Sequence, residues 1–287
     1  QHIVAVFEAA GIKAFPITKS IKKCNQRAWD QNRWLSFEEF DSLLGEPSAI
    51  IHAGAAVPRD GQYLSEREIF DVNVRATFNL ASWANSRRVP LVFISGAIVY
   101  KNQSVTGLDE KEELGPGGIG GIYGSSKLLA EHALQQVQSL GLQLAILRPT
   151  TIYGYGVDKN TIIRKFLDEL DECGTVTVNA PLEDSFNLIH AADVAASVYA
   201  IIEKADWSTF NIGSDQNVNV EEIARSCIAI KGNGKIVISP KTTENREPFS
   251  RFSVSSERAK RHLLWTPRVS LHEGIASMVH KKLLVID

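Results

Sequence analysis

The stretch "SSKLLAEHALQQVQSLGLQLAILRPTTIYG" (residues 125–154) decides the fold class, because it joins a helical pattern to a strand. Its first half is typical of a helix and ends at Gly141, a plausible helix stop. Its second half, "LQLAILRPTTIYG" (142–154), is typical of a strand. A helix that leads directly into a strand is the repeating unit of a parallel sheet wrapped by helices.

The same alternation extends toward the N-terminus. A capping box of Ser36 and Glu39 predicts the start of one helix there. The predicted helices are "QHIVAVFEAAG" (1–11), "SFEEFDSLL" (36–44) and "SEREIFDVNVRATFNLASWANSRR" (65–88). The predicted strands are "IKAFPI" (12–17), "SAIIHAGAAV" (48–57) and "VPLVFISGAIVY" (89–100). The sequence therefore predicts an α/β fold with a doubly wound parallel sheet, the Rossmann type.

The alternation loosens after Gly154. We expect a dinucleotide-binding domain over 1–154 that also receives about 188–213, because "FNLIHAADVAASVYAIIE" (186–203) returns to the sheet. Residues 155–287 then form mainly a substrate-binding region. A doubly wound domain that binds a dinucleotide begins with a strand, a glycine loop and a helix. This sequence begins in what reads as that helix, so we expect the first strand and its loop to precede Gln1; the alternative is a protein without them.

The bulk composition excludes several classes. The 287 residues carry a net charge of −2, which argues against a nucleic-acid footprint or a polybasic membrane face. Cys24, Cys173 and Cys227 have neither metal-ligand spacing nor the even number of a disulfide framework. No apolar run reaches the roughly 18 residues of a membrane helix. We expect a cytoplasmic protein without a metal site.

Two motifs overlap in "GPGGIGGIYGSSK" (115–127). Its glycines spell G-x-G-x-x-G, but acidic "LDEKEEL" precedes them where a phosphate loop needs a strand. Tyr123 and Lys127 spell Y-x-x-x-K, which places both side chains on one helix face. A nearby ammonium lowers a tyrosine pKa from about 10, so this pair can move protons. Alone, the pair is weak evidence, since surface residues produce it by chance.

The pair does not stand alone. "YGSSKLLAE" (123–131) resembles the active-site helix of the extended short-chain dehydrogenases, the NAD(P)-dependent epimerase/dehydratase family. Further resemblances follow in the order of that family: "IIHAGAAVP" (50–58), "FDVNVRATFNLASWA" (70–84), "LVFISGAIVY" (91–100), "LRPTTIYGYG" (147–156), "FNLIHAADVA" (186–195), "FNIGSDQNVNVEEIA" (210–224) and "SSERAKRHLLWTPRVSLHEGI" (255–275).

The resemblance implies roles for individual residues. Tyr123 would be the catalytic acid/base, and Lys127 would tune it and bind the nicotinamide ribose. His190 and Asp193 would tie the two regions together. Expected cofactor contacts, besides Tyr123 and Lys127, are Ala53, Gly54, Ala55, Ala56, Val57, Asn73, Thr150 and Ile152. Expected substrate contacts are Gly96, Ala97, Thr151 and Arg246. Asn73 could instead be a capping or surface residue, and Arg246 a solvent-exposed loop residue.

Three departures from the family pattern concern the chemistry. Gly96 stands where the family has its catalytic Ser or Thr. Either a local twist redirects the adjacent Ser95 as the third catalytic residue, or another group or a water replaces the hydroxyl. Ala97 and Ile98 stand where dehydratases and decarboxylases carry acids, which argues against elimination and decarboxylation. Thr151 replaces a substrate-binding asparagine, so the substrate could be an unusual sugar or no nucleotide sugar.

The fourth departure concerns the cofactor. NAD-specific members place an acid at the end of the second strand. Here the stretch "PITKSIKK" (16–23) offers Thr18, Lys19, Lys22 and Lys23. These residues favour a 2′-phosphate, so NAD or NADP is expected with a lean to NADP; a basic surface loop is the alternative.

We therefore expect an NAD(P)-dependent epimerase or ketoreductase that acts on a secondary alcohol or ketone of a nucleotide sugar through Tyr123 and Lys127. Two alternatives are a non-catalytic NAD(P)-binding sensor and a reductase of a non-sugar ketone. A homodimer through the Tyr/Lys helix is expected by resemblance, with no nucleic-acid or membrane partner.

Overall fold

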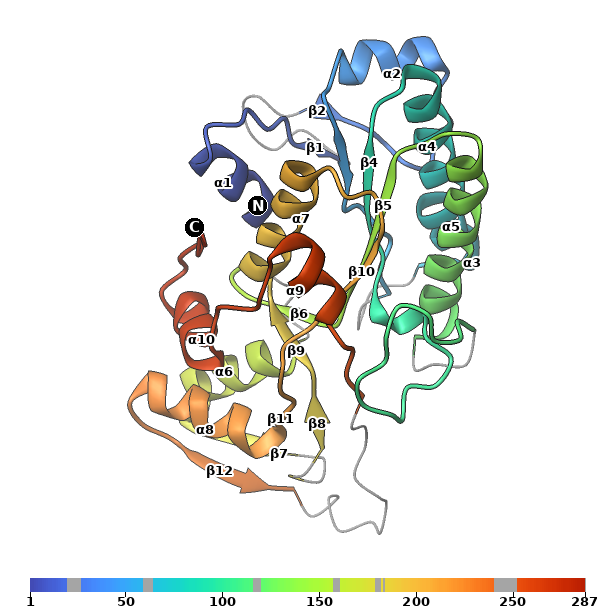
Figure 1. Cartoon of the computed structure of the whole chain (residues 1–287). Coiled ribbons are helices and arrows are strands. Elements are labelled where there is room, and N and C mark those ends of the chain that lie inside the picture. Colours follow the sequence, from blue (N-terminus) through green and yellow to red (C-terminus); the bar gives the residue numbers. More distant parts are fainter. Residues whose placement is uncertain are drawn as a thin grey trace.

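The computed structural model describes residues 1–19, 27–58, 64–115, 120–156, 161–178, 182, 184–239 and 252–286. A central sheet carries helices on both faces, and a smaller part with short strands lies below it in the view of Figure 1. None of the helices in these ranges is both long and apolar enough to cross a membrane.

The central sheet has four parallel strands. They are β3 (Ile50–His52), β4 (Leu91–Ile94), β5 (Leu144–Pro149) and β10 (Thr209–Ile212), in the spatial order β10-β5-β4-β3. β5 is buried along its whole length, as expected when helices cover both faces of a parallel sheet. The predicted α/β fold with a doubly wound parallel sheet is confirmed.

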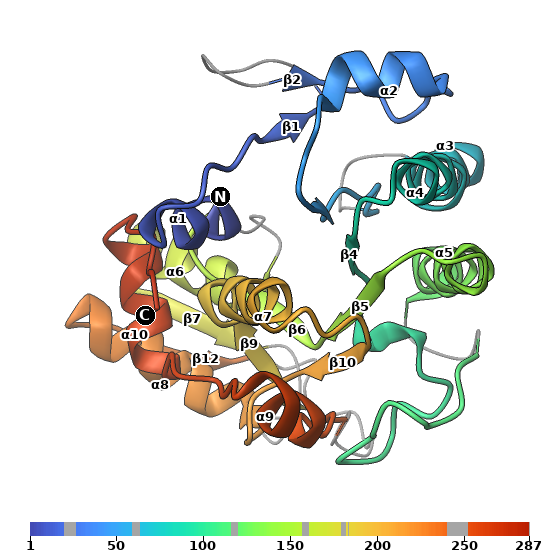
Figure 2. The same ribbon diagram turned by 45° about the horizontal axis from the view of Figure 1, so that its top comes forward.

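Alternate residues of β4 are buried on opposite faces of the sheet. Leu91 and Phe93 join the cluster formed with α4 (Ala76–Arg87) and α5 (Gly121–Ser139). Val92 joins the cluster formed with α1 (His2–Ala9) and α7 (Ala191–Lys204). This is the two-residue period of a strand with a core on each side. Figure 2 shows α4 and α5 together on one side of the strands, and α1 and α7 on the other.

The helix predicted over 65–88 is not uniform. It begins as α3 (Glu66–Phe70), widens into one π-helical turn, η1 (Asp71–Arg75), and continues as α4. A single π-turn occupies only a few residues of this long segment, and the prediction of one continuous helix did not include it. The capping box of Ser36 and Glu39, in contrast, is present at the start of α2 (Phe37–Leu44), as predicted.

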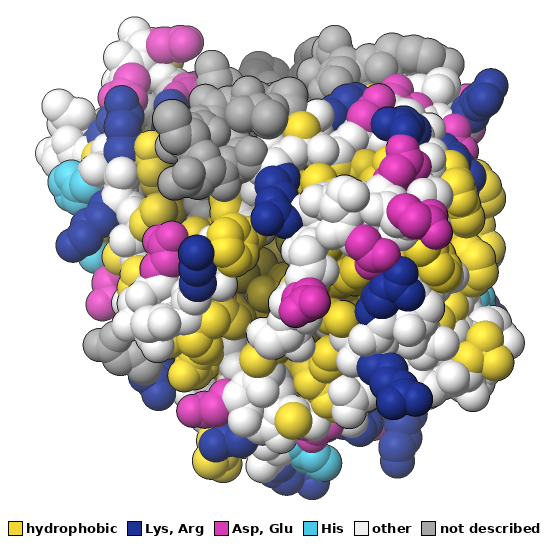
Figure 3. Space-filling model, turned by 90° about the horizontal axis from the view of Figure 1, so that it is seen from above, with side chains coloured by type: hydrophobic (Ala, Val, Ile, Leu, Met, Phe, Trp, Pro, Cys, Tyr) yellow, Lys and Arg dark blue, Asp and Glu magenta, His cyan; other side chains and the backbone are white. Residues whose placement is uncertain are grey.

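Two short strands, β1 (Ile17–Thr18) and β2 (Arg27–Ala28), form a parallel pair of their own. Within the described ranges, β3 pairs with β4 alone, and its isoleucines are only partly buried. A strand before Gln1 stays a prediction. Charged side chains of both signs are interspersed with hydrophobic ones on the face of the molecule in Figure 3.

The smaller part is built from strand pairs and helices around a separate core. The pairs are β6 (Thr151–Tyr153) with β9 (Leu188–His190), β7 (Thr175–Val178) with β12 (Lys235–Ile238), and β8 (Ser185–Phe186) with β11 (Val218–Asn219). The helices are α6 (Ile162–Cys173), α8 (Val220–Lys231) and α10 (Leu271–Val279), while α9 (Glu257–Leu263) packs against α7 and β10. The domain boundary at residue 154 stays a prediction.

Candidate active site

The predicted site residues gather at the carboxyl ends of three neighbouring strands. The turn of residues 53–57 follows β3, Ser95 and Gly96 follow β4, and Thr150 follows β5. Parallel strands end at the same edge of a sheet, where doubly wound folds bind their ligands. Helix α5, which carries Tyr123 and Lys127, packs on β5 and on the short 3-10 turn η2 (Ala97–Val99).

Lys127 is buried, with 2% of its surface exposed. Its Nζ donates a hydrogen bond to the Ile94 carbonyl oxygen at 2.9 Å and lies 4.8 Å from the centre of the Phe93 ring. Burial lowers the pKa of Lys127 to about 8, although Glu131 opposes the shift. The ammonium is thus held at the end of β4, at a residue two positions before Gly96.

Tyr123 lies one helical turn before Lys127 and is partly buried. Burial raises its pKa, because a phenolate loses hydration in such a place. The phenol is therefore protonated at neutral pH and can donate a proton. That Lys127 lowers the pKa of Tyr123 during reaction stays a prediction.

Asn73 clamps the turn that follows β3. Its Oδ1 accepts a hydrogen bond from the Ala56 amide at 2.7 Å, and its Nδ2 donates to the Ala56 carbonyl at 3.0 Å and to the Ser126 hydroxyl at 2.9 Å. Ser126 donates in turn to the Tyr123 carbonyl at 2.7 Å. Asn73, placed by the π-turn η1, thus joins the turn at Ala56 to the Tyr/Lys helix. Its role as a cofactor contact stays a prediction.

Sequence reasoning missed His52, the last residue of β3. Its Nε2 lies 2.9 Å from the Thr77 hydroxyl, which donates its proton to the Asn73 carbonyl at 2.8 Å. His52 Nε2 is therefore the donor. Burial and the nearby Lys127 lower the pKa of His52 to about 3, so the imidazole is neutral. The sequence did carry a signal for it, because His52 is a polar residue in an apolar strand, directly before the small-residue turn of 53–57.

Two hydroxyls at the strand ends have no hydrogen-bond partner within the described residues. Ser95 Oγ is one, on a residue 5% exposed, and Thr150 Oγ1 is the other, on a residue 7% exposed. A buried hydroxyl without a partner costs free energy unless a water or a ligand satisfies it. Both hydroxyls are therefore suited to hold a bound cofactor or substrate.

Gly96 is extended, with φ −178°, a conformation open to any residue. A Cβ there would lie 3.6 Å from Ile98 Cγ2, an ordinary contact, so the position has room for a serine side chain. The side chain of Ile98 packs against the start of α5. A Cβ at Gly120 would lie 2.2 Å from Ile98 Cδ1, and one at Gly124 3.4 Å from Ile98 Cγ1. These two glycines therefore let helix and η2 approach closely.

The remaining predicted contacts differ in surroundings. In the turn after β3, Ala53 and Val57 are exposed, while the Gln31 amide covers Gly54 so that a Cβ there would lie 2.8 Å from Nε2. Ala55, Ala56 and Ile152 are partly buried, Ala97 is buried, and Thr151 is exposed.

The basic residues predicted to favour NADP are only partly described. Lys19 Nζ lies 3.7 Å from a Glu68 carboxylate oxygen. Lys22, Lys23 and Arg246 lie outside the described residues, as does Gly117 of the G-x-G-x-x-G match. The cofactor preference therefore stays a prediction.

Asp193 joins α7 to the chain before α10. Its carboxylate accepts hydrogen bonds from the Arg268 amide at 2.7 Å and the Val269 amide at 3.2 Å, and its carbonyl accepts one from Trp265 Nε1 at 2.9 Å. His190 caps α7 through the Ala192 amide at 3.1 Å, and its Nε2 lies 3.4 Å from the Ser277 hydroxyl on α10. These contacts support the interpretation that both residues tie regions together.

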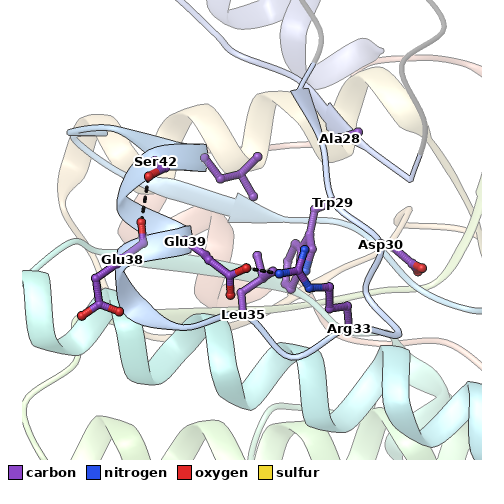
Figure 4. A pocket seen from close by; sticks show the side chains of 9 residues that line it. Ala28, Trp29, Asp30, Arg33, Leu35, Glu38, Glu39 and Ser42 are labelled. Carbon is purple, nitrogen blue, oxygen red and sulfur yellow. Dashed lines mark hydrogen bonds and ion pairs between the residues drawn. The ribbon is translucent and has the colours of Figure 1, made fainter.

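A surface pocket of about 510 Å³ is lined by residues of β2, of α2 and of the segment between them. Figure 4 shows the Arg33 and Glu39 side chains meeting across it. It is lined by Ala28, Trp29, Asp30, Arg33, Leu35, Glu38, Glu39, Ser42 and Leu43. Within the described part of the chain, no three His, Cys, Asp or Glu residues are grouped in a way that could hold a metal ion.

The chain is similar to known proteins of one family. A family model described as "NAD dependent epimerase/dehydratase family" matches residues 1–213. ADP-L-glycero-D-manno-heptose-6-epimerase of Alkalilimnicola ehrlichii is 26% identical over 74% of this chain and 68% of the relative. Polyketide synthase-nonribosomal peptide synthetase ACE1 of Pyricularia oryzae is 28% identical over 57% of this chain, but the match spans only 4% of that protein.

Solved structures share the fold. UDP-N-acetylglucosamine 4-epimerase from Bacillus cereus has a TM-score of 0.81 over 97% of this chain and 90% of that chain, with 23% identity. MoeE5, solved with UDP-glucuronic acid and NAD, has a TM-score of 0.79 over 98% of this chain and 94% of that chain, with 20% identity.

Proposed function

The chain belongs to the NAD dependent epimerase/dehydratase family, and from that premise we propose that it transfers hydride at a secondary alcohol or ketone of a nucleotide sugar. The observation that carries the proposal is Tyr123 and Lys127 on one face of α5, beside the carboxyl ends of β4 and β5. The reaction is an epimerisation or a ketone reduction.

The residues present fit a nicotinamide cofactor. The small side chains of the turn 53–57 would let a ligand approach the backbone once the Gln31 amide moves off Gly54, and Asn73 holds the shape of the turn. Ser95 and Thr150 offer unpartnered hydroxyls at the neighbouring strand ends. NAD(P), when bound, supplies or accepts the hydride. Lys127 would bind the ribose, and Thr150 and Ile152 would lie near the nicotinamide amide.

Tyr123 would move the proton at the substrate oxygen. In reduction, the substrate carbon gains hydride and its oxygen gains the proton of the Tyr123 hydroxyl. The raised pKa of Tyr123 suits this donor role. In the oxidation direction the phenolate takes the proton back, and the buried ammonium of Lys127 stabilises that phenolate. Ser95 would donate a hydrogen bond to the same oxygen.

The substrate side favours epimerisation or reduction over elimination. Ala97 and Ile98 bring no carboxylate to the end of β4. Gly96, Ala97, Thr151 and Arg246 would contact the sugar, and residues 155–287 would mainly shape its binding region. The identity of the relatives as nucleotide-sugar enzymes supports the substrate class.

The quaternary structure is proposed to be a homodimer. Large apolar side chains are exposed on adjoining helices: Phe70 on α3, Phe78 on α4, and Ile122 and Leu129 on α5. Such a face is typical of an interaction surface. Analytical ultracentrifugation should give a dimer for the native chain and a monomer for Phe78→Asp with Leu129→Asp; a native monomer would contradict this proposal.

Replacing Tyr123 tests the mechanism. With a panel of nucleotide sugars and NAD(H) or NADP(H), Tyr123→Phe should lower turnover by about 10²–10⁴-fold and leave cofactor affinity unchanged. Tyr199→Phe is a matched control, because Tyr199 packs on Phe7 at the α1–α7 contact. An epimerase interconverts sugars without net cofactor consumption, whereas a reductase consumes NAD(P)H stoichiometrically. Full activity of Tyr123→Phe would refute the proposed acid/base.

A non-catalytic cofactor sensor is the second candidate, and Gly96 is the observation that favours it. A sensor would bind NAD(P) but turn over none of the sugars. Tyr123→Phe would leave unchanged the rise in melting temperature that NAD(P) causes in such a sensor.

A further inference from the structure

Glu131 and Arg148 form a buried ion pair between helix α5, which carries Tyr123 and Lys127, and strand β5. Glu131 on α5 is 0% exposed and Arg148 on β5 is 3% exposed. Arg148 Nη2 donates to Glu131 Oε2 at 2.7 Å, and Nε donates to both carboxylate oxygens at 3.2 Å. Buried ion pairs often contribute no more to stability than well-packed apolar residues would. A purely structural role is therefore a weak explanation for this one.

The Glu131 end of the ion pair lies on the same helix as the proposed catalytic residues. Glu131 follows Lys127 by one helical turn, so both side chains share one face of α5. Among the described residues, Glu131 on the same helix and His52 at the end of β3 interact electrostatically with Lys127. Tyr123 lies one turn away on α5, and Arg148 on β5 is paired with Glu131. His52 is neutral and Tyr123 is protonated, so Glu131 is the source of negative charge among these groups.

Arg148 also fixes the position of Glu131 relative to the sheet. Its Nη1 donates to the Tyr100 hydroxyl at 3.1 Å and to the Glu110 carbonyl at 3.3 Å. The Tyr100 hydroxyl donates to Asn211 Oδ1 at 2.7 Å, which carries the network to β10. The carboxylate of Glu131 is thus held by a guanidinium that is itself held by the Tyr100 hydroxyl and the Glu110 carbonyl.

We propose that Glu131 is a positioning residue for the Tyr123/Lys127 pair, anchoring their helix to β5 through Arg148 and supplying the negative charge that keeps Lys127 an ammonium. This inference rests on the proposed function. A lysine buried without a nearby carboxylate releases its proton more readily, and a neutral amine stabilises no phenolate.

The test follows Lys127 itself rather than turnover. In protein labelled with ¹³C-lysine, the Lys127 signal is assigned by its loss in Lys127→Arg and then titrated by NMR. In Glu131→Gln, which removes the charge but keeps the size, the midpoint for Lys127 should fall by about one pH unit or more. Glu131→Asp should restore most of the shift. Glu113→Gln, at an exposed pair with Lys101, is the matched control and should change nothing.

The double variant Glu131→Met with Arg148→Met covers the case in which Glu131→Gln does not fold, since it removes both members of the ion pair and leaves neither of them unpaired. Lys127 should again titrate at lower pH. An unchanged midpoint in either folded variant overturns the inference. Turnover should fall at least tenfold above pH 8 in Glu131→Gln and recover toward lower pH. If the native chain turns over no substrate, the proposed function fails while the Lys127 titration still decides this inference.

Discussion

Two groups of polar side chains at the end of β4 and β5 differ in how they are satisfied. On the α5 side, Glu131 and Arg148 are paired with each other, and Arg148 also donates to the Tyr100 hydroxyl and the Glu110 carbonyl. At the strand tips, the hydroxyls of Ser95 and Thr150 have no partner among the described residues. The comparison teaches that the buried ion pair is satisfied within the protein, whereas the two hydroxyls leave hydrogen-bonding capacity that a ligand can use.

The largest expected effect breaks the satisfied side. Arg148→Met leaves the Glu131 carboxylate buried and unpaired, so the free energy of unfolding should fall by about 3–5 kcal/mol. Chemical denaturation followed by circular dichroism measures it. A loss below about 1 kcal/mol would show that water or another cation reaches Glu131, and the contrast with the strand tips would disappear.

The next effect concerns Asp193, a second satisfied carboxylate. Burial raises its pKa to about 6, above its unfolded value of about 4, although two backbone amides oppose the shift. A raised pKa favours the protonated folded form, so this contribution is fully present below pH 4 and is lost as the pH rises through 6. Native protein should lose about 3 kcal/mol over that window relative to Asp193→Asn. A flat difference between the two denaturation curves would contradict this.

The third effect adds a group to the unsatisfied side. Gly96→Ser places a hydroxyl where the position is open, and turnover of a proven substrate should rise about tenfold or more. Gly96→Ala is the matched control, because it adds the Cβ without the hydroxyl. An equal change in both variants would mean that packing, not hydrogen bonding, limits the reaction.

The smallest expected effect is the loss of an exposed ion pair, which serves as the reference for the buried pair removed in Arg148→Met. Lys101→Met removes a cation from an exposed pair with Glu113 at 2.7 Å. Exposed ion pairs contribute little, so stability should change by less than about 1 kcal/mol. A loss as large as that of Arg148→Met would indicate that burial does not separate the two pairs.

Much of the fold was accessible from the sequence, because local patterns carry it. The helix–strand alternation and the cap at Ser36 depend on residues close together in the chain. The placement of Tyr123 and Lys127 could also be predicted, since residues four positions apart lie on the same face of a helix. The clamp of Asn73 on Ala56 and the pairing of Glu131 with Arg148 were not, because they join residues 17 positions apart through tertiary packing.

The glycines before Tyr123 illustrate the same limit. In the sequence they spell the G-x-G-x-x-G of a phosphate loop, without the strand that such a loop needs before it. The structure shows Ile98 seated where a side chain of Gly120 would project. Spacing along the chain contains no information about a neighbour on a different segment.

The contact of Ile98 with Gly120 and Gly124 has a consequence for how this protein can diverge. A larger residue at 120 requires Ile98 to turn away or shrink, and an acid at 98 meets the same narrow space. Substitutions at the three positions should therefore be correlated among descendants of this chain. A lineage that acquired a carboxylate here would have to remodel the start of α5 at the same time, so new chemistry at this site is expected to arise by paired changes rather than single ones.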